Sequence, residues 1–267
     1  MRKYYTRACN FYYGAVAESF IKKKKAFSLC GSKYIAFDNI EIISRGKKTK
    51  KINIKNIKKL SNQIKKTVLK DLKKITSKRQ KLNQYINFSE PLIMGVLNLT
   101  PDSFSDGGLY IKSKQAFAHI NNMIHKGADI IDIGGESTRP GSKNIPHKIE
   151  WQRLEKIIIN FKKKFPKVFL SIDTRKTEIM LKAIKYKSDL INDVSGFNYD
   201  LKAVEKIKNY NIWKVLHHMK GTPNTMQIKP SYKNVLLDVY DFFERKINID
   251  FKKFKHKKFI IDPGIGF

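Results

Sequence analysis

A regular alternation of apolar runs and amphipathic stretches, from residue 91 onward, constrains the fold of this chain most. Short apolar runs typical of buried strands occur at 92–97, 130–133, 168–172, 190–191, 212–216 and 259–261. Between them lie stretches with helical spacing at 113–126, 149–164, 177–187, 200–210 and 234–246. Strict alternation of this kind predicts parallel strands joined by crossover helices, in either a doubly wound sheet or a (β/α) barrel.

The position of the polar residues favours the barrel. Each apolar run is followed closely by polar side chains, namely Asn98, Glu136, Asp173, Asn192-Asp193, His217-His218 and Asp262. A doubly wound sheet gathers its ligand groups at one switch point, whereas a barrel collects them from the carboxyl ends of all its strands. Residues 91–267 supply six such units, and a closed barrel needs eight over about 250 residues. We therefore expect an incomplete TIM (β/α)8 barrel with two open sheet edges, either a fragment or completed by another chain.

Residues 1–90 differ in kind from the rest. They hold 24 Lys and Arg against five acidic residues. The run 34–43 predicts one or two short strands, and 52–75 predicts one lysine-rich amphipathic helix. We expect a small, basic α+β extension at 1–90, to which the sequence assigns no role, followed by the barrel at 91–267.

Composition bounds the function classes. The formal charge of +32 invites a nucleic-acid partner, but only eight of the 55 basic residues are Arg, and Lys is spread along the whole chain. This pattern favours compositional drift over a dedicated phosphate-binding surface. There are two cysteines and no apolar run of the length of a membrane span or a secretory signal, so we expect a cytoplasmic protein without membrane contact.

The strand-end residues suggest two kinds of chemistry. The carboxylates of Asp173 and Asp262 could serve as general acid and base. Together with Asn192, whose amide can both donate and accept, they could instead hydrogen-bond a heterocycle rich in N–H groups, such as a pterin or guanine edge. Arg139, in a turn with Pro140, could form a structural ion pair or clamp a phosphate or carboxylate. No Gly-x-Ser-x-Gly motif occurs, which argues against acyl transfer. His217 and His218 point to opposite faces of a strand and so cannot share a metal; one of them should pack at the barrel mouth.

At these residues the chain resembles dihydropteroate synthase. The resemblance covers 91–267 and is carried by six segments: Asn98-Leu-Thr-Pro-Asp-Ser-Phe-Ser-Asp-Gly-Gly, Asp132-Ile-Gly-Gly-Glu-Ser-Thr-Arg-Pro-Gly, Ser171-Ile-Asp-Thr, Ile191-Asn-Asp-Val, His218-Met-Lys-Gly and Asp262-Pro-Gly-Ile-Gly-Phe. That family of transferases condenses 6-hydroxymethyl-7,8-dihydropterin pyrophosphate with p-aminobenzoate to 7,8-dihydropteroate and pyrophosphate in folate biosynthesis, and sulfonamides compete for its p-aminobenzoate site.

The resemblance implies roles for individual residues. Asn98 would bind the Mg²⁺ that holds the pyrophosphate. Thr138, Arg139 and Pro140 would shape the p-aminobenzoate pocket, with Arg139 also near phosphate. Asp173, Asn192 and Asp262 would hydrogen-bond the pterin; Asn98, Arg139, Asp173 and Asp262 would form the catalytic set. Met219 would pack on the ring and Phe267 would lie near p-aminobenzoate. A homodimer is expected of the complete protein.

Two family motifs are absent from this chain: a Ser-Arg-Lys after strand seven and an Arg-x-His after strand eight. We therefore expect the chain by itself to have little or no activity. Two alternatives remain open at this point. One is a pterin- or methyltetrahydrofolate-binding barrel of the methyltransferase type, which would not need the arylamine; the other is a non-catalytic basic binding protein.

Overall fold

The computed structural model describes residues 3–88, 90–100, 109–137, 144–221, 225 and 229–265, and the side chains of 109–112 also lie outside the description. Contacts between Cα atoms divide the chain into two compact units. One comprises Met1–Glu90 and Asn234–Leu237, and the other Pro91–Lys233 and Asp238–Phe267. Among the described residues, no helix is long and apolar enough to cross a membrane.

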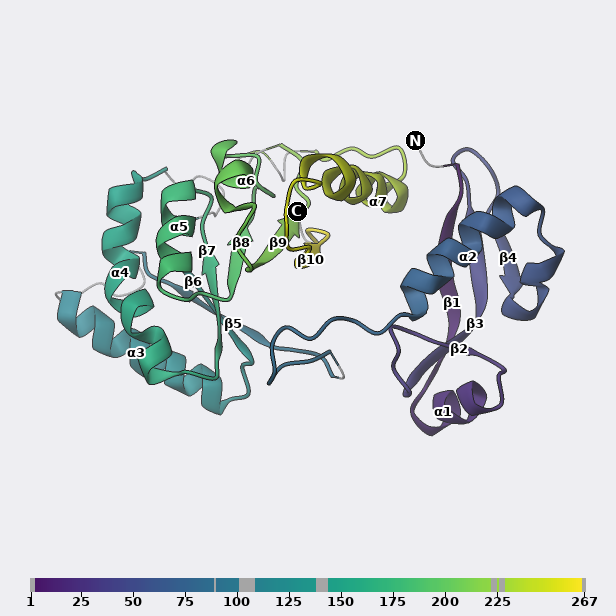
Figure 1. Ribbon diagram of the computed structural model, residues 1–267, viewed down its shortest axis with the longest axis horizontal. Coiled ribbons are helices and arrows are strands. Elements are labelled where there is room, and N and C mark those ends of the chain that lie inside the picture. Colours follow the sequence, from purple (N-terminus) through teal and green to yellow (C-terminus); the bar gives the residue numbers. More distant parts are fainter. Residues whose placement is uncertain are drawn as a thin grey trace. The chain divides into compact units, whose positions relative to one another are not determined.

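The N-terminal unit is an antiparallel sheet with helices packed on it (Figure 1). Strand β1 (Tyr5–Tyr13) and the short β2 (Phe27–Ser28) pair with opposite sides of β3 (Ile35–Ile43), and β4 (Lys50–Asn53) also pairs with β3. The helical elements are α1 (Gly14–Lys22), the 3₁₀ helix η1 (Ile54–Lys59) and α2 (Asn62–Thr76). Its core consists of Phe37, Ile40, Ile42, Ile54, Ile57, Val68 and Leu72. The expected small α+β unit is therefore present.

The expectation of one helix over 52–75 is wrong in its first part. Ile52 lies in β4 opposite Ile40, so the sheet takes a residue that the helical spacing had included. Asn53 then accepts a hydrogen bond from the backbone N–H of Lys55 and starts the separate 3₁₀ helix. The regular helix begins only at Asn62. Sequence periodicity also gave no indication of β1 and α1.

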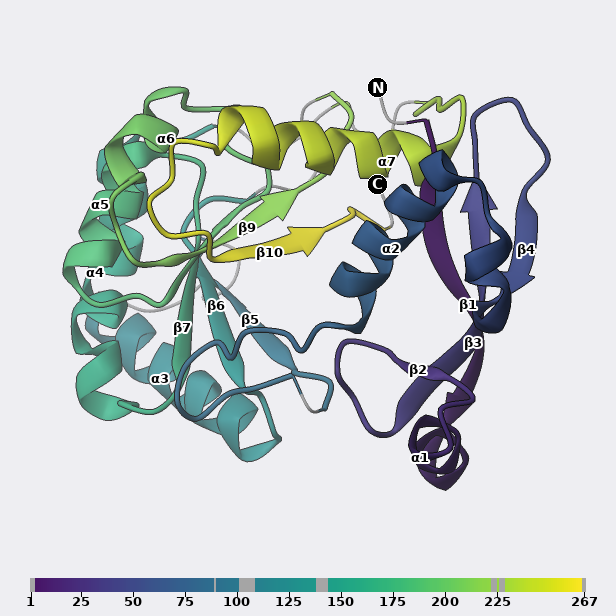
Figure 2. The same ribbon diagram turned by 45° about the vertical axis from the view of Figure 1, so that its right-hand side comes forward.

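The second unit is a curved parallel sheet with helices on its outer side (Figure 2). Its strands are β5 (Met94–Asn98), β6 (Ile130–Gly134), β7 (Phe169–Asp173), β8 (Leu190–Asp193), β9 (Trp213–His217) and β10 (Phe259–Asp262). The connecting helices are α3 (Leu109–His125), α4 (His147–Lys164), α5 (Thr177–Lys185), α6 (Lys202–Ile207) and α7 (Val235–Arg245), which a single π-helical turn, Lys246–Asp250, continues.

The strands lie in chain order, each paired in parallel with the next. In the described part of the chain, β5 pairs only with β6 and β10 only with β9, so the predicted open edges are confirmed. Val96 and Ile261, on these two edge strands, each expose about half of their surface, 53% and 51%. An α/β barrel of six strands that does not close is therefore the observed fold of this unit.

The apolar core lies between the strands and the helices. Alternate strand residues such as Ile131, Ile133, Leu170 and Ile172 are fully buried against the helices. The helix residues expected in the core, Ile157, Ile158, Phe161 and Met180, are buried as well. Because neighbouring residues of a strand point to opposite faces, the remaining strand residues project into the interior of the barrel. This second set forms the candidate site.

Candidate active site

Strand register brings three predicted site residues into one row. Asn98 is paired with Gly134, Gly134 with Asp173, and Asp173 with Asn192. Paired residues of adjacent parallel strands project to the same face, so the side chains of Asn98, Asp173 and Asn192 all point into the barrel at the carboxyl ends of β5, β7 and β8. The predicted convergence of these residues is present in the structure.

Asp262 belongs to the same face, one step nearer the barrel mouth. Asn192 is paired with Val215, and His217, two residues further along β9, is paired with Asp262. The Nδ1 atom of His217 lies 3.9 Å from Oδ2 of Asp262, and Oδ1 of Asp262 accepts the backbone N–H of Gly264 at 2.9 Å. Asp262 is thereby held facing the interior beside β9.

Gly134 leaves space between Asn98 and Asp173. A β-carbon at this position would lie 3.3 Å from Oδ1 of Asn98 and 3.4 Å from Oδ2 of Asp173. Any side chain on β6 at this level would therefore stand between the amide and the carboxylate. The glycine allows these two oxygen-bearing groups to approach a common volume above the strand.

The carboxyl groups in this interior have unusual acidities. Burial raises the pKa of Asp173 well above its ordinary value, and the negative charges of Asp132, Asp193 and Glu150 add to this, against the opposing charge of Arg175. Burial also raises the pKa of Asp132, which hydrogen bonds from Ser171 and Asn192 partly offset. Carboxyl groups with such perturbed acidity are concentrated at functional sites, because binding or chemistry compensates the energy of burying them.

The two histidines separate as expected. His218 packs its ring against Phe242 and Phe243 on α7, with ring centroids 5.0 Å and 6.3 Å away. His217 lies on the interior face with Asp262. Burial is the main cause that lowers the pKa of each imidazole. One histidine of the pair, His218, therefore packs at the barrel mouth, as the sequence predicted.

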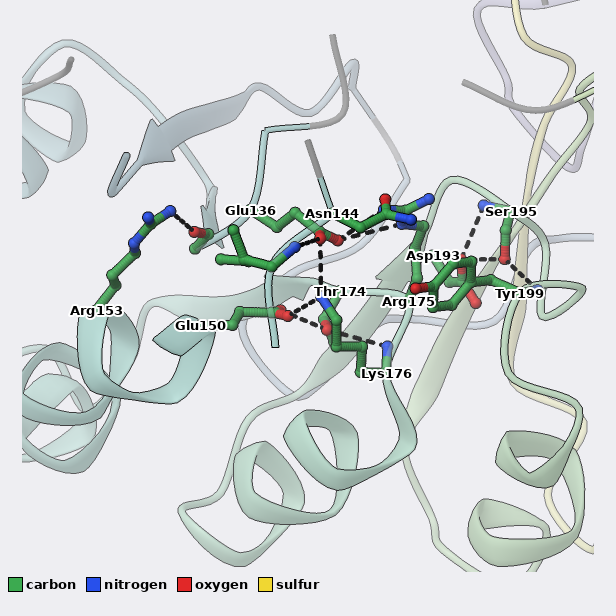
Figure 3. Close-up of polar contacts among 12 residues, drawn as sticks. Glu136, Asn144, Glu150, Arg153, Thr174, Arg175, Lys176, Asp193, Ser195 and Tyr199 are labelled. Carbon is green, nitrogen blue, oxygen red and sulfur yellow. Dashed lines mark hydrogen bonds and ion pairs between the residues drawn. The ribbon is translucent and has the colours of Figure 1, made fainter. Parts of the chain in front are cut away.

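A network of buried ion pairs lies among the loops next to the row of Asn98, Asp173 and Asn192 (Figure 3). Glu136 accepts from Arg175 Nη2 at 2.8 Å and pairs with Lys176 Nζ at 2.9 Å. Lys176 also pairs with Oε2 of the fully buried Glu150 at 2.6 Å. Although burial alone raises the pKa of Glu136, the N–H of Ile145 and the two cations bring the pKa below its ordinary value. Glu136 is therefore a charged, structural residue.

This network joins three loops at the carboxyl end of the barrel. The Nη2 atom of Arg175 also donates to Oδ1 of Asn144 at 2.9 Å, and its guanidinium lies 4.3 Å from the ring centre of Tyr199 (Figure 3). The loops after β6, β7 and β8 are thus connected through one side chain. Sequence reasoning missed Arg175; the available signal was the basic pair Arg175-Lys176, which Thr174 separates from Asp173.

Asp193 has a structural task despite its place beside Asn192. It points away from the barrel interior and accepts hydrogen bonds from the backbone N–H and hydroxyl of Ser195 (Figure 3). It also accepts the backbone N–H of Phe197. Burial raises its pKa to about 6, in spite of these three donors. The carboxylate therefore shapes the loop after β8, while Asn192 faces the site.

Several residues predicted from the resemblance are outside the described part of the chain: Thr138, Arg139, Pro140 and Phe267. Met219 is described and is half-buried directly after His218. Among the described residues, no group of three or more His, Cys, Asp or Glu could hold a metal ion by itself. Mg²⁺ commonly takes one or two protein oxygens and completes its shell with water and substrate phosphate, and the exposed Asn98 amide beside the Gly134 gap fits that mode.

Comparison with known proteins gives the family. The family described as "Pterin binding enzyme" matches residues 94–267, which include every strand of the barrel. The chain belongs to the pterin-binding enzyme family. Its relatives include dihydropteroate synthases; the one from Escherichia coli strain K12 is 38% identical over 183 residues, which are 68% of this chain and 64% of that protein. The chain thus spans less than two thirds of the length of this relative.

Solved structures of pterin-binding enzymes agree in fold. The dihydropteroate synthase of Xanthomonas albilineans with 4-aminobenzoic acid aligns at a TM-score of 0.61 and 35% identity, over 68% of this chain and 64% of that one. The dihydropteroate synthase of Anaplasma phagocytophilum with bound 6-hydroxymethylpterin-monophosphate aligns at 0.59 and 30%, over 66% of this chain and 68% of that one. The incomplete TIM barrel predicted from the sequence is therefore confirmed.

Proposed function

We propose that the barrel seats the pterin ring of 6-hydroxymethyl-7,8-dihydropterin pyrophosphate and serves a dihydropteroate synthase, which joins that substrate to p-aminobenzoate. The observation that carries the proposal is the row of Asn98, Asp173 and Asn192 with Asp262 on the same interior face. Membership of the pterin-binding enzyme family supports it, as do the two ligands of the structural relatives, an aminobenzoate and a pterin phosphate.

The chemistry of the row suits a flat ring with several N–H groups. Asp173 and Asp262 offer carboxyl oxygens, and Asn192 offers both an acceptor and a donor. A buried donor left without a partner costs about 1–3 kcal/mol, so a ring whose N–H groups match these acceptors is favoured over one that lacks them. The raised pKa of Asp173 shows that burial makes its charged form unfavourable, so a hydrogen bond from a ring N–H group would stabilise that charged form strongly.

The remaining roles concern the reacting groups. The arylamine nitrogen of p-aminobenzoate attacks the methylene carbon of the pterin, and the carbon–oxygen bond to pyrophosphate breaks with its electron pair leaving on the pyrophosphate. The nitrogen then loses one proton to water, which leaves a neutral secondary amine. Asn98 would hold Mg²⁺, which when bound supplies positive charge to the pyrophosphate. In this proposal Arg139 lies near phosphate; Thr138, Arg139 and Pro140 shape the p-aminobenzoate pocket; Met219 packs on the ring, and Phe267 lies near the arylamine. Sulfonamides would compete at that pocket.

The proposed function also bears on the location and the oligomeric state of the protein. We propose that the protein acts in the cytoplasm, since the substrates of a folate-pathway transferase are small, charged and water-soluble. We propose that the whole protein is a homodimer, by analogy with its family. The proposal assigns no role to the basic N-terminal unit.

The proposal is tested by binding. Titration of 6-hydroxymethylpterin monophosphate into the 267-residue chain, followed by calorimetry, should give one site per barrel. Asp173→Asn should weaken the affinity by about tenfold or more, because it removes one charged acceptor. A matched control is Asp189→Asn, whose carboxylate pairs with Lys162 and the N–H of Leu170 outside the row. Absence of binding by the unaltered chain, or equal effects of the two variants, would refute the proposal.

A further inference from the structure

Asp132 is a buried carboxylate directly beneath the row of site residues, and the proposed function gives it no role. It is the third residue of β6 and is paired with Ser171 on β7. Only 3% of its surface is exposed. Asp132 therefore lies one level deeper in the barrel than Asp173 and Asn192, where a charged group requires a structural or functional reason.

Both oxygens of this carboxylate accept hydrogen bonds from site-facing side chains. The hydroxyl of Ser171 donates to Oδ1 at 2.5 Å, and the amide Nδ2 of Asn192 donates to Oδ2 at 3.0 Å. Asn192 belongs to β8, two strands away from β6, so its side chain reaches across Ser171 to meet the carboxylate. The carboxylate thus ties the amide of Asn192 to the wall of the barrel.

The contact with Asp132 determines the orientation of the Asn192 amide group. An asparagine side chain has a donor end and an acceptor end of nearly the same shape, and its hydrogen-bond partners decide the orientation. An ionised carboxylate only accepts, so the Nδ2 end of Asn192 must lie beside Asp132. The carbonyl oxygen of Asn192 then takes the other position, with one N–H of Nδ2 still available beside it.

We propose that Asp132 is a positioning residue that fixes the donor–acceptor order of Asn192 and thereby makes the site select a ring edge that donates an N–H over one that presents an oxygen. This inference rests on the proposed function, since it requires a ring bound at Asn192. It assigns Asp132 no contact with the ring itself. The selectivity arises because a ring edge that presents an oxygen would face the carbonyl oxygen of Asn192, and the contact with Asp132 prevents that amide from rotating.

The test compares two ligands that differ at one hydrogen-bonding group. One is 6-hydroxymethylpterin monophosphate, and the other is its lumazine counterpart, in which oxygen replaces the 2-amino group. We expect the unaltered chain to prefer the pterin. Asp132→Asn should reduce that preference by about tenfold, because an amide at position 132 can donate or accept and leaves Asn192 free to turn.

A matched control comes from the opposite end of the same strand. Asp129 precedes β6, and its Oδ2 accepts the backbone N–H of Ile93 at 2.8 Å. Asp129→Asn should change the preference for the pterin less than twofold. A second variant, Ser171→Ala, removes the hydroxyl that holds the other oxygen of Asp132 and should reduce the preference in the same direction, by a smaller factor.

The outcomes are distinguishable from failure of the proposed function. If the unaltered chain does not bind the pterin, the proposed function fails. If it binds but shows no preference, or if Asp132→Asn and Ser171→Ala keep the full preference, the inference about Asp132 is overturned while ring binding stands. In an Asn192→Ala background, Asp132→Asn should have no further effect on the preference; an undiminished effect there would show that Asp132 does not act through Asn192.

Discussion

Replacing Glu136 with Gln should severely destabilise the barrel unit. The carboxylate is 4% exposed and receives the side chains of Arg175 and Lys176 together with the backbone N–H of Ile145. A glutamine keeps one oxygen but turns an amide NH₂ group toward one of these donors. The two cations then lose a buried negative partner.

The expected magnitude follows from the burial of the pair. Removing one partner of a buried ion pair typically lowers the free energy of unfolding by about 3–5 kcal/mol, because the other charge stays buried. For a domain of this size, each kcal/mol corresponds to about 2–4 °C in the melting temperature. Glu136→Gln should therefore lower the melting temperature by roughly 6–20 °C. Glu150 remains next to Lys176, at 2.6 Å, and favours the lower part of this range.

Tryptophan fluorescence is the suitable assay. The chain has two tryptophans, Trp151 and Trp213, and both belong to the barrel unit, so the signal reports the unfolding of that unit alone. The matched control is Glu205→Gln, which removes an exposed ion pair between Glu205 on α6 and Lys208, the residue after that helix, and should change the midpoint little. If Glu136→Gln shifted the midpoint no more than this control does, the account of the buried network would be refuted.

Two further predictions concern the site and its pH dependence. Gly134→Ala should weaken pterin binding about tenfold, because the added β-carbon pushes Asn98 and Asp173 apart. The control is Gly95→Ala, whose added β-carbon would lie 2.8 Å from the sulfur of Met123 on the outer side of the sheet; this variant should lower stability but not pterin binding. Equal effects of the two variants on binding would contradict the prediction. The carboxyl group of Asp193 should titrate with a midpoint of about 6 in carboxyl-detected NMR. Because folding raises this pKa, the protonated group contributes stability that is fully present below about pH 4 and is lost as the pH rises through 6. A measured midpoint near about 4 would contradict the argument that burial raises the pKa.

The sequence predicted the barrel unit well because its signals are local. Five of the six apolar runs are followed directly by a polar residue, and in the structure Asn98, Asp173 and Asp262 are the last residues of β5, β7 and β10. Strand ends can be recognised in this way without knowing which strands are neighbours. Parallel pairing in chain order then brings them to one edge.

The sequence was a poorer guide where the same residue type occurs in both strands and helices. The isoleucines between 52 and 75 fit a helical spacing, yet Ile52 belongs to a strand and Ile54 to a 3₁₀ helix. The contact of Asn192 with Asp132 was not predictable either, since it depends on the register of three strands. The same holds for Arg175, whose partners come from two other loops: Glu136 and Asn144 from the loop after β6, and Tyr199 from the loop after β8.

The central claim is that four side chains on one interior face seat a pterin ring. A crystal structure of this chain with 6-hydroxymethylpterin monophosphate tests it most directly. We predict density for the ring above Gly134, within hydrogen-bonding distance of Asp173, Asn192 and Asp262, with its phosphate directed toward Asn98. A ring bound elsewhere on the chain, or Asn98, Asp173, Asn192 and Asp262 turned away from one another around it, would contradict the claim.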